Sequence, residues 1–364
     1  MTDEKPLILV SGVTGYIGAR VAREFLDNGY RVRGTVRSLM SHKGKEHLDA
    51  WKENGEPIEI VEANLTDEDC WADACKDCKF VAHVASPFFV GCPDSEAEEK
   101  LFKPAKKGTL NVLRAAQAAG VKRVVVTSSV AAITAGHPFQ KVYEKPEEMW
   151  SDIKKADNYS KSKTMAEKAA WDFVEEQRSA GNEVFELATV NPTFVIGPPC
   201  SSGSATSHDL FKTLLNRGMP VVPDIRLGEV DVRDVAKCHR LAIETPDAAG
   251  KRFACFNDNS GFLEMAKIMK EEFEQYGYKI PTGKAPYPVL FVLSLFMKQV
   301  AAIRPRVGKE SPLIANTLSK NVLGMEYISV EESVKEHVHG AIQSGVRGFH
   351  KTKQYEEYLK TAKP

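Results

Sequence analysis

Near its N-terminus the sequence reads LILVSGVTGYIG, which spans Leu7–Gly18. Its four leading apolar residues predict a buried strand, and glycines follow at the spacing GxxGxxG, as Gly12, Gly15 and Gly18. A helical pattern begins at Ile17. Glycines at such a turn let the backbone approach a pyrophosphate, whose charge is stabilised by the N–H groups of the helix N-terminus. The order of strand, glycines and helix therefore predicts a dinucleotide site rather than a merely tight turn.

The first half of the chain alternates short β-branched runs with longer helical patterns. The runs that predict strands are Leu7–Val10, Arg31–Val36, the segment around Ile60, Phe80–Ala85, Arg123–Thr127 and Val184–Val190. Strands that are almost continuously apolar and are separated by helices form parallel sheets covered on both faces. We therefore predict an α/β fold with a doubly wound parallel sheet, a Rossmann domain.

A chain of 364 residues is long enough for two lobes. We assign residues 1–196 to the Rossmann domain and residues 197–364 mainly to a smaller, mostly helical lobe that binds substrate. A strand and helix pattern starts at Glu229, so we expect the segment of about 229–256 to rejoin the first domain. The segment 197–210 begins with GPPCSSGSATS, whose turn residues predict a mobile lid that closes over cofactor or substrate.

Within the smaller lobe, helical patterns lie around residues 265–276 and 330–343. The longest apolar run, Val289–Met297, is shorter than the roughly 20 residues that span a bilayer. We interpret it as a buried helix of this lobe.

The composition excludes several kinds of partner. Lys and Arg number 49 and balance 49 Asp and Glu, and no basic stripe with aromatic residues occurs, so nucleic acid is not expected. The N-terminal segment lacks the long apolar run of a signal peptide, which predicts a cytoplasmic protein. We expect a small-molecule substrate, no membrane partner, and a monomer or a homodimer.

The chain has seven cysteines, an odd number. Cys75 and Cys78 form a CxxC pair, which could be redox-active or half of a zinc site. No second pair completes four ligands. We therefore expect unpaired thiols and no metal.

The end of the second predicted strand distinguishes between cofactors. NAD-binding proteins usually place an acid there for the ribose hydroxyls, whereas a 2′-phosphate needs positive charge. The sequence is TVRSLMSHKGK, with Arg37, Ser38, Lys43 and Lys45 and no acid before Glu46. This pattern favours NADPH, although ordinary exposed basic residues would have the same composition.

A candidate catalytic pair lies in DNYSKSKTMAEKAAW, Asp157–Trp171. In the helix predicted here, Tyr159 and Lys163 share a face and Lys161 points nearly the opposite way, toward solvent. A cation within about 4–6 Å stabilises a phenolate, so Lys163 could tune Tyr159. Tyrosine and lysine also occur four apart in many helices by chance, so the pair alone is weak.

The fifth predicted strand ends in Ser128 and Ser129. Ligands of a doubly wound sheet gather at the carboxyl ends of its strands, so these hydroxyls could face a nicotinamide. Serines also end strands for local turn reasons.

These motifs, in this order, resemble the extended short-chain dehydrogenase/reductases. More narrowly, the chain is similar to the group of dihydroflavonol reductase, cinnamoyl-CoA reductase and methylglyoxal (ketone) reductase. The stretches that carry the likeness are VAHVASPF (Val81–Phe88), FKPAKKGTLNVLRAA (Phe102–Ala116), VVTSSVAA, YSKSKTMAEKAAW and ATVNPTFVIGP (Ala188–Pro198).

The resemblance implies a role for each matching residue. The catalytic residues are Ser129, Tyr159 and Lys163, the last also binding the nicotinamide ribose. The implied cofactor contacts are Gly12, Gly15, Tyr16, Ile17 and Gly18 at the phosphates, Arg37 at the 2′-phosphate, Leu65 and Ala85 near the adenosine, Ser128, Tyr159 and Lys163, and Pro192 to Val195 beside the nicotinamide.

Two departures from the family pattern matter. Asn64 stands where relatives usually carry Asp before the leucine near the adenine, which makes that contact neutral. Lys106 and Lys107 stand where relatives commonly have an acidic or small residue. We interpret these lysines as a solvated face, which leaves no asparagine for the proton relay of other short-chain reductases.

The resemblance implies NADPH-dependent reduction of an aldehyde or ketone to an alcohol, with Tyr159 as proton donor. A nucleotide-sugar epimerase or dehydratase with bound NAD is an alternative that uses the same Tyr/Lys pair. A non-catalytic NADPH-binding sensor is a further alternative. The substrate pocket is expected from Ala131–Pro138, the 197–210 segment and the smaller lobe, where fold says little about specificity.

Overall fold

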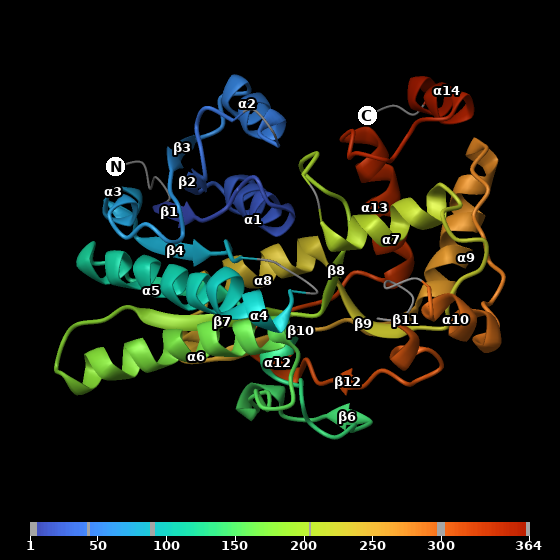
Figure 1. Cartoon of the computed structure of the whole chain (residues 1–364). Coiled ribbons are helices and arrows are strands. Elements are labelled where there is room, and N and C mark those ends of the chain that lie inside the picture. Colours follow the sequence, from blue (N-terminus) through green and yellow to red (C-terminus); the bar gives the residue numbers. More distant parts are fainter. Residues whose placement is uncertain (1–5, 42–43, 88–91, 204, 297–302, 362–364) are drawn as a thin grey trace.

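The computed structural model describes residues 6–41, 44–87, 92–203, 205–296 and 303–361. Its main sheet has seven parallel strands in the spatial order β10-β7-β5-β4-β1-β2-β3 (Figure 1). The strands are β1 (Leu7–Val10), β2 (Arg31–Val36), β3 (Ile58–Glu62), β4 (Phe80–His83), β5 (Arg123–Thr127), β7 (Glu186–Pro192) and β10 (Arg252–Cys255). The chain order reverses between β1 and β4, and this is where such sheets bind ligands. The predicted doubly wound sheet is confirmed.

Alternation along β1 shows how the sheet acquires two cores. Ile8 and Val10 pack on one face with α1 (Tyr16–Asp27) and α8 (Val232–Glu244). Leu7 and Leu9 pack on the other face with helices α3 (Cys70–Cys75), α5 (Lys103–Ala118) and α6 (Asn158–Ser179). A strand that is buried on both faces must be apolar throughout, as β1 is. Figure 1 shows α5 and α6 side by side along one face.

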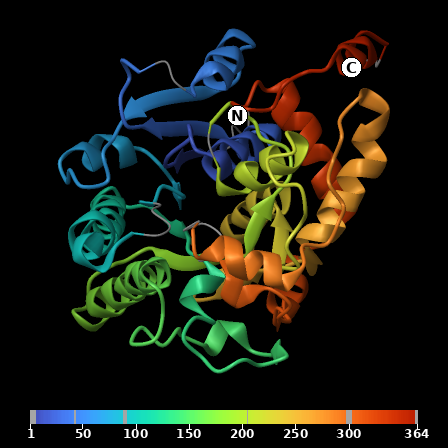
Figure 2. The ribbon, with the colours of Figure 1, turned by 45° about the vertical axis from the view of Figure 1, so that its right-hand side comes forward.

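A smaller lobe surrounds a three-stranded sheet in the order β11-β9-β8. These strands are β8 (Phe194–Ile196), β9 (Arg226–Asp231) and β11 (Asp258–Gly261). The helices of its core are α7 (Thr206–Leu215), α9 (Phe262–Phe273), α13 (Val330–Gln343) and α14 (Lys353–Thr361). In Figure 2 the light-orange and red helices of this lobe stand together on the right-hand side.

The remaining elements are short. They are α2 (Glu46–Glu53), α4 (Asp94–Ala97), a short π-helix (Glu98–Phe102), α10 (Tyr287–Ser294), α12 (Thr317–Leu323), a parallel pair of β6 (Val142–Tyr143) with β12 (Leu313–Ile314), and several single 3-10 turns. None of the helices in the described ranges is long and apolar enough to cross a membrane.

The chain returns to the first domain differently from the simplest expectation. The strand expected from Glu229 is β9, which begins at Arg226 and pairs with β8 in the lobe sheet. The helix after it, α8, packs against α1, and β10 then joins the main sheet beside β7. We propose a division into a first domain of residues 1–196 with about 229–256 and a lobe from the rest of 197–364, except that β8 and the end of β9 belong to the sheet of the lobe.

The prediction that Val289–Met297 is buried is wrong. The helix here is α10, in which Leu290 is buried but Val289, Phe291 and Val292 are 44, 46 and 52% exposed. Met297 lies outside the described residues. A helix that is apolar all round is ordinarily buried, but among the described residues nothing covers the exposed sides of α10.

Candidate active site

The glycine motif forms a turn that larger residues do not fit. Gly12 has a φ of 73°, in the left-handed region that favours glycine. A Cβ atom on Gly18 would lie 2.2 Å from the carbonyl oxygen of Gly12, and one on Gly12 would lie 3.0 Å from the Cβ of Ala85. Gly15 is the N-cap of α1 and supplies no side-chain cap. The first N–H groups of α1 can therefore bind an anion, at the end of β4.

The side chains of Tyr16 and Ile17 serve the fold. The Tyr16 hydroxyl donates a hydrogen bond to the carbonyl of Gly197 (2.7 Å), and Ile17 packs against the core of the α1 face. A phosphate contact from these two residues would come from their backbone N–H groups.

At the end of β2, Arg37 is exposed. Lys45 is buried and its Nζ donates to the carbonyl of Leu39 (2.7 Å), while Lys43 lies outside the described residues. Glu62, on the neighbouring β3, accepts a hydrogen bond from the Leu39 amide (2.8 Å). Arg37 is thus an exposed cation at this edge, as binding a 2′-phosphate requires.

The expected adenine side lies after β3. Leu65 packs against Gly108 of α5, where an added Cβ would lie 3.0 Å from the Cβ of Leu65. The Nδ2 of Asn111 donates to the Leu65 carbonyl (2.9 Å). The exposed Asn64 accepts at its Oδ1 from the amide of Thr66 (3.2 Å), so its side chain belongs to a local turn.

Helix α6 presents the candidate catalytic pair. Asp157 is its N-cap and accepts from the amide of Ser160 (3.0 Å), so Tyr159 lies in the first turn and Lys163 one turn later. Lys163 is buried, at 8% exposure. Lys161 is half-buried rather than fully solvated as the pattern predicts.

The side chains of Ser129 and Tyr159 meet. Ser129 follows β5 in an extended conformation and caps the turn Val130–Ala132, its Oγ accepting from the Ala131 amide (3.1 Å). Burial raises the pKa of Tyr159 above its ordinary value, a hydrogen bond with Ser129 lowers it and Asp157 raises it further. Because the net shift is upward, the phenol is protonated at neutral pH, which is the form that can donate a proton.

A cavity of about 10 Å³, which has room for about one water, is lined by Lys163, His83, Thr109 and Ser128. Burial lowers the pKa of Lys163 to about 8, and Glu167 opposes that shift. Burial and then Lys163 lower the pKa of His83 to about 3, so this imidazole is neutral. The predicted action of Lys163 on Tyr159 stays a prediction, since the pKa of Tyr159 is set here by burial, Ser129 and Asp157.

The ends of β5 and β7 are tied together. The Nδ2 of Asn191 donates to the Ser129 carbonyl (3.2 Å), and the Ser128 amide donates to the Val190 carbonyl (2.8 Å). Pro192 ends β7, and Val195 lies in β8 against the core of the α1 face. The residues expected beside the nicotinamide therefore lie at one carboxyl edge with Ser129.

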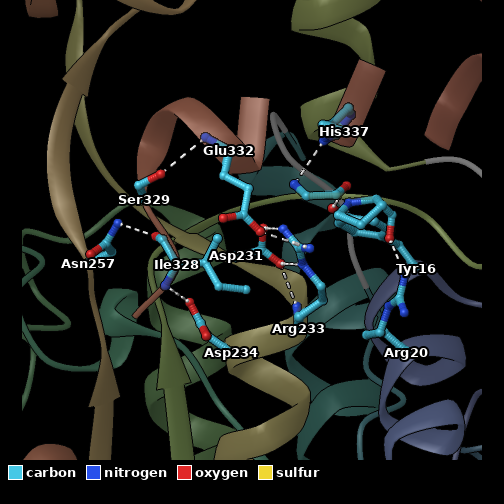
Figure 3. Close-up of polar contacts among 12 residues, drawn as sticks. Tyr16, Arg20, Asp231, Arg233, Asp234, Asn257, Ile328, Ser329, Glu332 and His337 are labelled. Carbon is cyan, nitrogen blue, oxygen red and sulfur yellow. Dashed lines mark hydrogen bonds and ion pairs between the residues drawn. The ribbon is translucent and has the colours of Figure 1, made fainter. Parts of the chain in front are cut away.

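The base of the 197–210 segment is held by three elements. The Gly197 amide donates to Nδ1 of His337 (3.1 Å), its carbonyl accepts from Tyr16, and the Pro198 carbonyl accepts from Arg20 (2.8 Å) (Figure 3). The Oγ of Ser202 contacts Glu46 of α2 (3.1 Å). From Thr206 onward the segment is helix α7. Its role as a lid stays a prediction.

The sequence pattern does not single out Glu167, which is buried one turn beyond Lys163. Its carboxylate accepts from Ser128 of the candidate site and from Arg252 of β10. An acid four residues after Lys163 is the local pattern that could have indicated Glu167. Its ion-pair partner Arg252, however, lies far away in the sequence.

All seven cysteines are free thiols. Burial raises the pKa of Cys75 to about 12 and that of Cys78 to about 11. Thiols with such values are inert at neutral pH. In the part of the chain that the structure describes, no group of three or more His, Cys, Asp or Glu side chains could hold a metal.

The family model of the NAD dependent epimerase/dehydratase family matches residues 8–255. The chain belongs to this family. It is 33% identical over 341 residues to cinnamoyl-CoA reductase CAD2 of Medicago truncatula, covering 91% of this chain and 94% of that one. It is 32% identical to the putative NADPH-dependent methylglyoxal reductase GRP2 of Candida albicans, covering 91% and 97%. The resemblance to extended short-chain reductases is confirmed.

A solved structure agrees with these relatives. The yeast methylglyoxal/isovaleraldehyde reductase Gre2 complexed with NADPH superimposes with a TM-score of 0.74 at 26% identity. The superposition covers 93% of this chain and 98% of that one.

Proposed function

We propose that this protein reduces an aldehyde or a ketone to an alcohol, with NADPH as the hydride donor. The observation that carries the proposal is the contact between Ser129 and Tyr159 at the carboxyl edge of the sheet, where the phenol is protonated. The relatives confirm the enzyme class, an NADP-dependent oxidoreductase, and the cofactor. The exposed Arg37 and the uncapped N-terminus of α1 fit the phosphates of this cofactor.

Each side chain has a distinct task in the proposed reduction. The bound cofactor supplies the hydride. Ser129 orients the carbonyl oxygen by a hydrogen bond, and Tyr159 donates its phenolic proton to the same oxygen as negative charge develops there. Positioned donors of this kind each contribute about 10²–10⁴-fold. Lys163 binds the nicotinamide ribose and stabilises the phenolate that remains.

The test is NADPH oxidation, followed at saturating cofactor against a panel of aldehydes and ketones that includes methylglyoxal, aromatic aldehydes and flavonoid ketones. At least one compound should be reduced, and Ser129→Ala should lower its turnover by about 100-fold. Failure of the whole panel, with NADPH bound, would overturn the proposal. Interconversion of nucleotide sugars by the NAD-loaded protein would favour the epimerase alternative.

A further inference from the structure

The buried acid of the catalytic helix is Glu167. It lies one turn after Lys163 on α6, so the two side chains share a face of the helix, and it is 1% exposed. A carboxylate in this position is costly to bury unless it is paired and hydrogen-bonded.

Five donors lie within hydrogen-bond distance of the Glu167 carboxylate. Its Oε2 accepts from Ser128 Oγ (2.5 Å) and from Asn191 Nδ2 (2.8 Å). Its Oε1 accepts from Arg252 Nε (2.6 Å), Thr189 Oγ1 (3.1 Å) and Trp171 Nε1 (3.4 Å). The carboxylate therefore connects α6 to the ends of β5 and β7 and to β10.

Arg252, which pairs with Glu167, is also buried and is hydrogen-bonded through Nε and Nη1. Its side chain is 7% exposed, and its Nη1 donates to the carbonyls of Met149 (2.5 Å) and Glu147 (3.2 Å). Its guanidinium lies 3.8 Å from the ring centroid of Trp150. Buried ion pairs add little stability compared with apolar residues of similar volume, so stability is a weak reason for a charge here.

Another reason for a charge at position 167 is Lys163, which lines the same small cavity as Glu167. The polar groups that line this cavity are neutral apart from Lys163 and Glu167: His83 of β4, Thr109 of α5, Thr127 at the end of β5 and Ser128 just after it. The π-helix and α5 also pack against α6, and their charged residues are exposed. These include Glu98, Glu99, Lys106 and Lys107. Glu167 is thus the anion that faces Lys163 among the described residues.

We propose that Glu167 is a positioning residue for the reduction, which holds Lys163 as a cation and fixes the strand ends that carry Ser129 and Asn191. The assignment rests on the proposed function. Burial alone would favour the neutral amine, so the carboxylate opposes deprotonation. Arg252 is the counter-ion that keeps Glu167 in place.

The experiment compares pH profiles of kcat/KM and of NADPH affinity for the parent, Glu167→Gln and Thr189→Val. As pH rises through the pKa of Lys163, the ammonium is lost and both quantities should fall. Glu167→Gln removes the charge, so this falling limb should move to lower pH by about one unit. Thr189→Val removes a hydroxyl that lies 2.9 Å from Asn191 Oδ1 and 3.1 Å from Glu167 Oε1, and it keeps the carboxylate, so its limb should coincide with that of the parent. A purely structural role would lower rates in both variants without moving the limb.

NADPH affinity, measured by cofactor fluorescence, separates this inference from the proposed function because it needs no turnover. A parent that binds NADPH but reduces no carbonyl would refute the function, while the binding limb still tests Glu167. A limb of Glu167→Gln that coincides with the parent's overturns the inference. If that variant does not fold, Glu167→Asp is the second variant. It keeps a carboxylate to pair with Arg252 but places it farther from Lys163, so the falling limb should move to lower pH by about half a unit. An unmoved limb in that variant overturns the inference as well.

Discussion

Replacing Glu229 by glutamine should stabilise the protein at alkaline pH. Glu229 lies on β9 and is 0% exposed. Burial, followed by repulsion from Asp258, raises its pKa to about 8 from the ordinary 4.5. The folded state therefore keeps a proton that the unfolded state releases between these two values. The free energy of unfolding is therefore unaffected by this group at acidic pH, and it falls as pH rises from about 4.5 to about 8.

The size of the effect follows from the width of that window. Each pH unit across it costs about 1.4 kcal/mol, so the parent should lose on the order of 4 kcal/mol between pH 5 and pH 8 from this group. Glutamine has no proton to hold and is spared this loss. The difference in unfolding free energy between Glu229→Gln and the parent should therefore grow by that amount over the same range.

Urea unfolding followed by circular dichroism at pH 5, 6.5 and 8 measures the effect. Glu271→Gln is the matched control, because Glu271 of α9 is exposed and is not among the charges that raise the pKa of Glu229, so its replacement should change stability by less than about 0.5 kcal/mol at each pH. Parallel pH dependences for the parent and Glu229→Gln would refute the reasoning, since the carboxyl group would then ionise as easily in the folded protein as in the unfolded chain.

Three further predictions concern cofactor and catalysis. Arg37→Ala should raise the KM for NADPH by about 10-fold or more and leave that for NADH nearly unchanged, because only NADPH carries the 2′-phosphate; equal use of both cofactors by the parent would contradict this. NADPH should slow hydrogen exchange across residues 197–210, and unchanged exchange would argue against a lid. Lys163→Ala should lose rate and weaken NADPH binding while Lys161→Ala changes little, and equal damage from both would contradict the assigned roles.

The elements that the sequence predicts well are those set by local patterns. The unbroken apolar run of β1 and the spacing of Gly12, Gly15 and Gly18 are short-range features, and the structure realises both. The pair of Tyr159 and Lys163 follows from helical periodicity in the same way, since the cap at Asp157 fixes where the helix begins.

Other features depend on contacts that no local pattern encodes. The exposure of α10 is invisible to periodicity because its residues are apolar on every side. Glu167 meets Arg252 only because β10 joins the edge of the main sheet, and the Gly197 amide meets His337 only because α13 packs over β8 and β9. Such pairings come from the folded topology, so the sequence alone leaves them open.

Turnover of Tyr159→Phe on one carbonyl that the parent reduces, measured together with NADPH affinity, tests whether Tyr159 donates the proton. Phenylalanine keeps the ring and removes the hydroxyl that contacts Ser129. If Tyr159 is the donor, turnover should fall by about 100-fold or more while the Kd for NADPH changes by less than about threefold. Turnover near that of the parent would rule out Tyr159 as the proton donor.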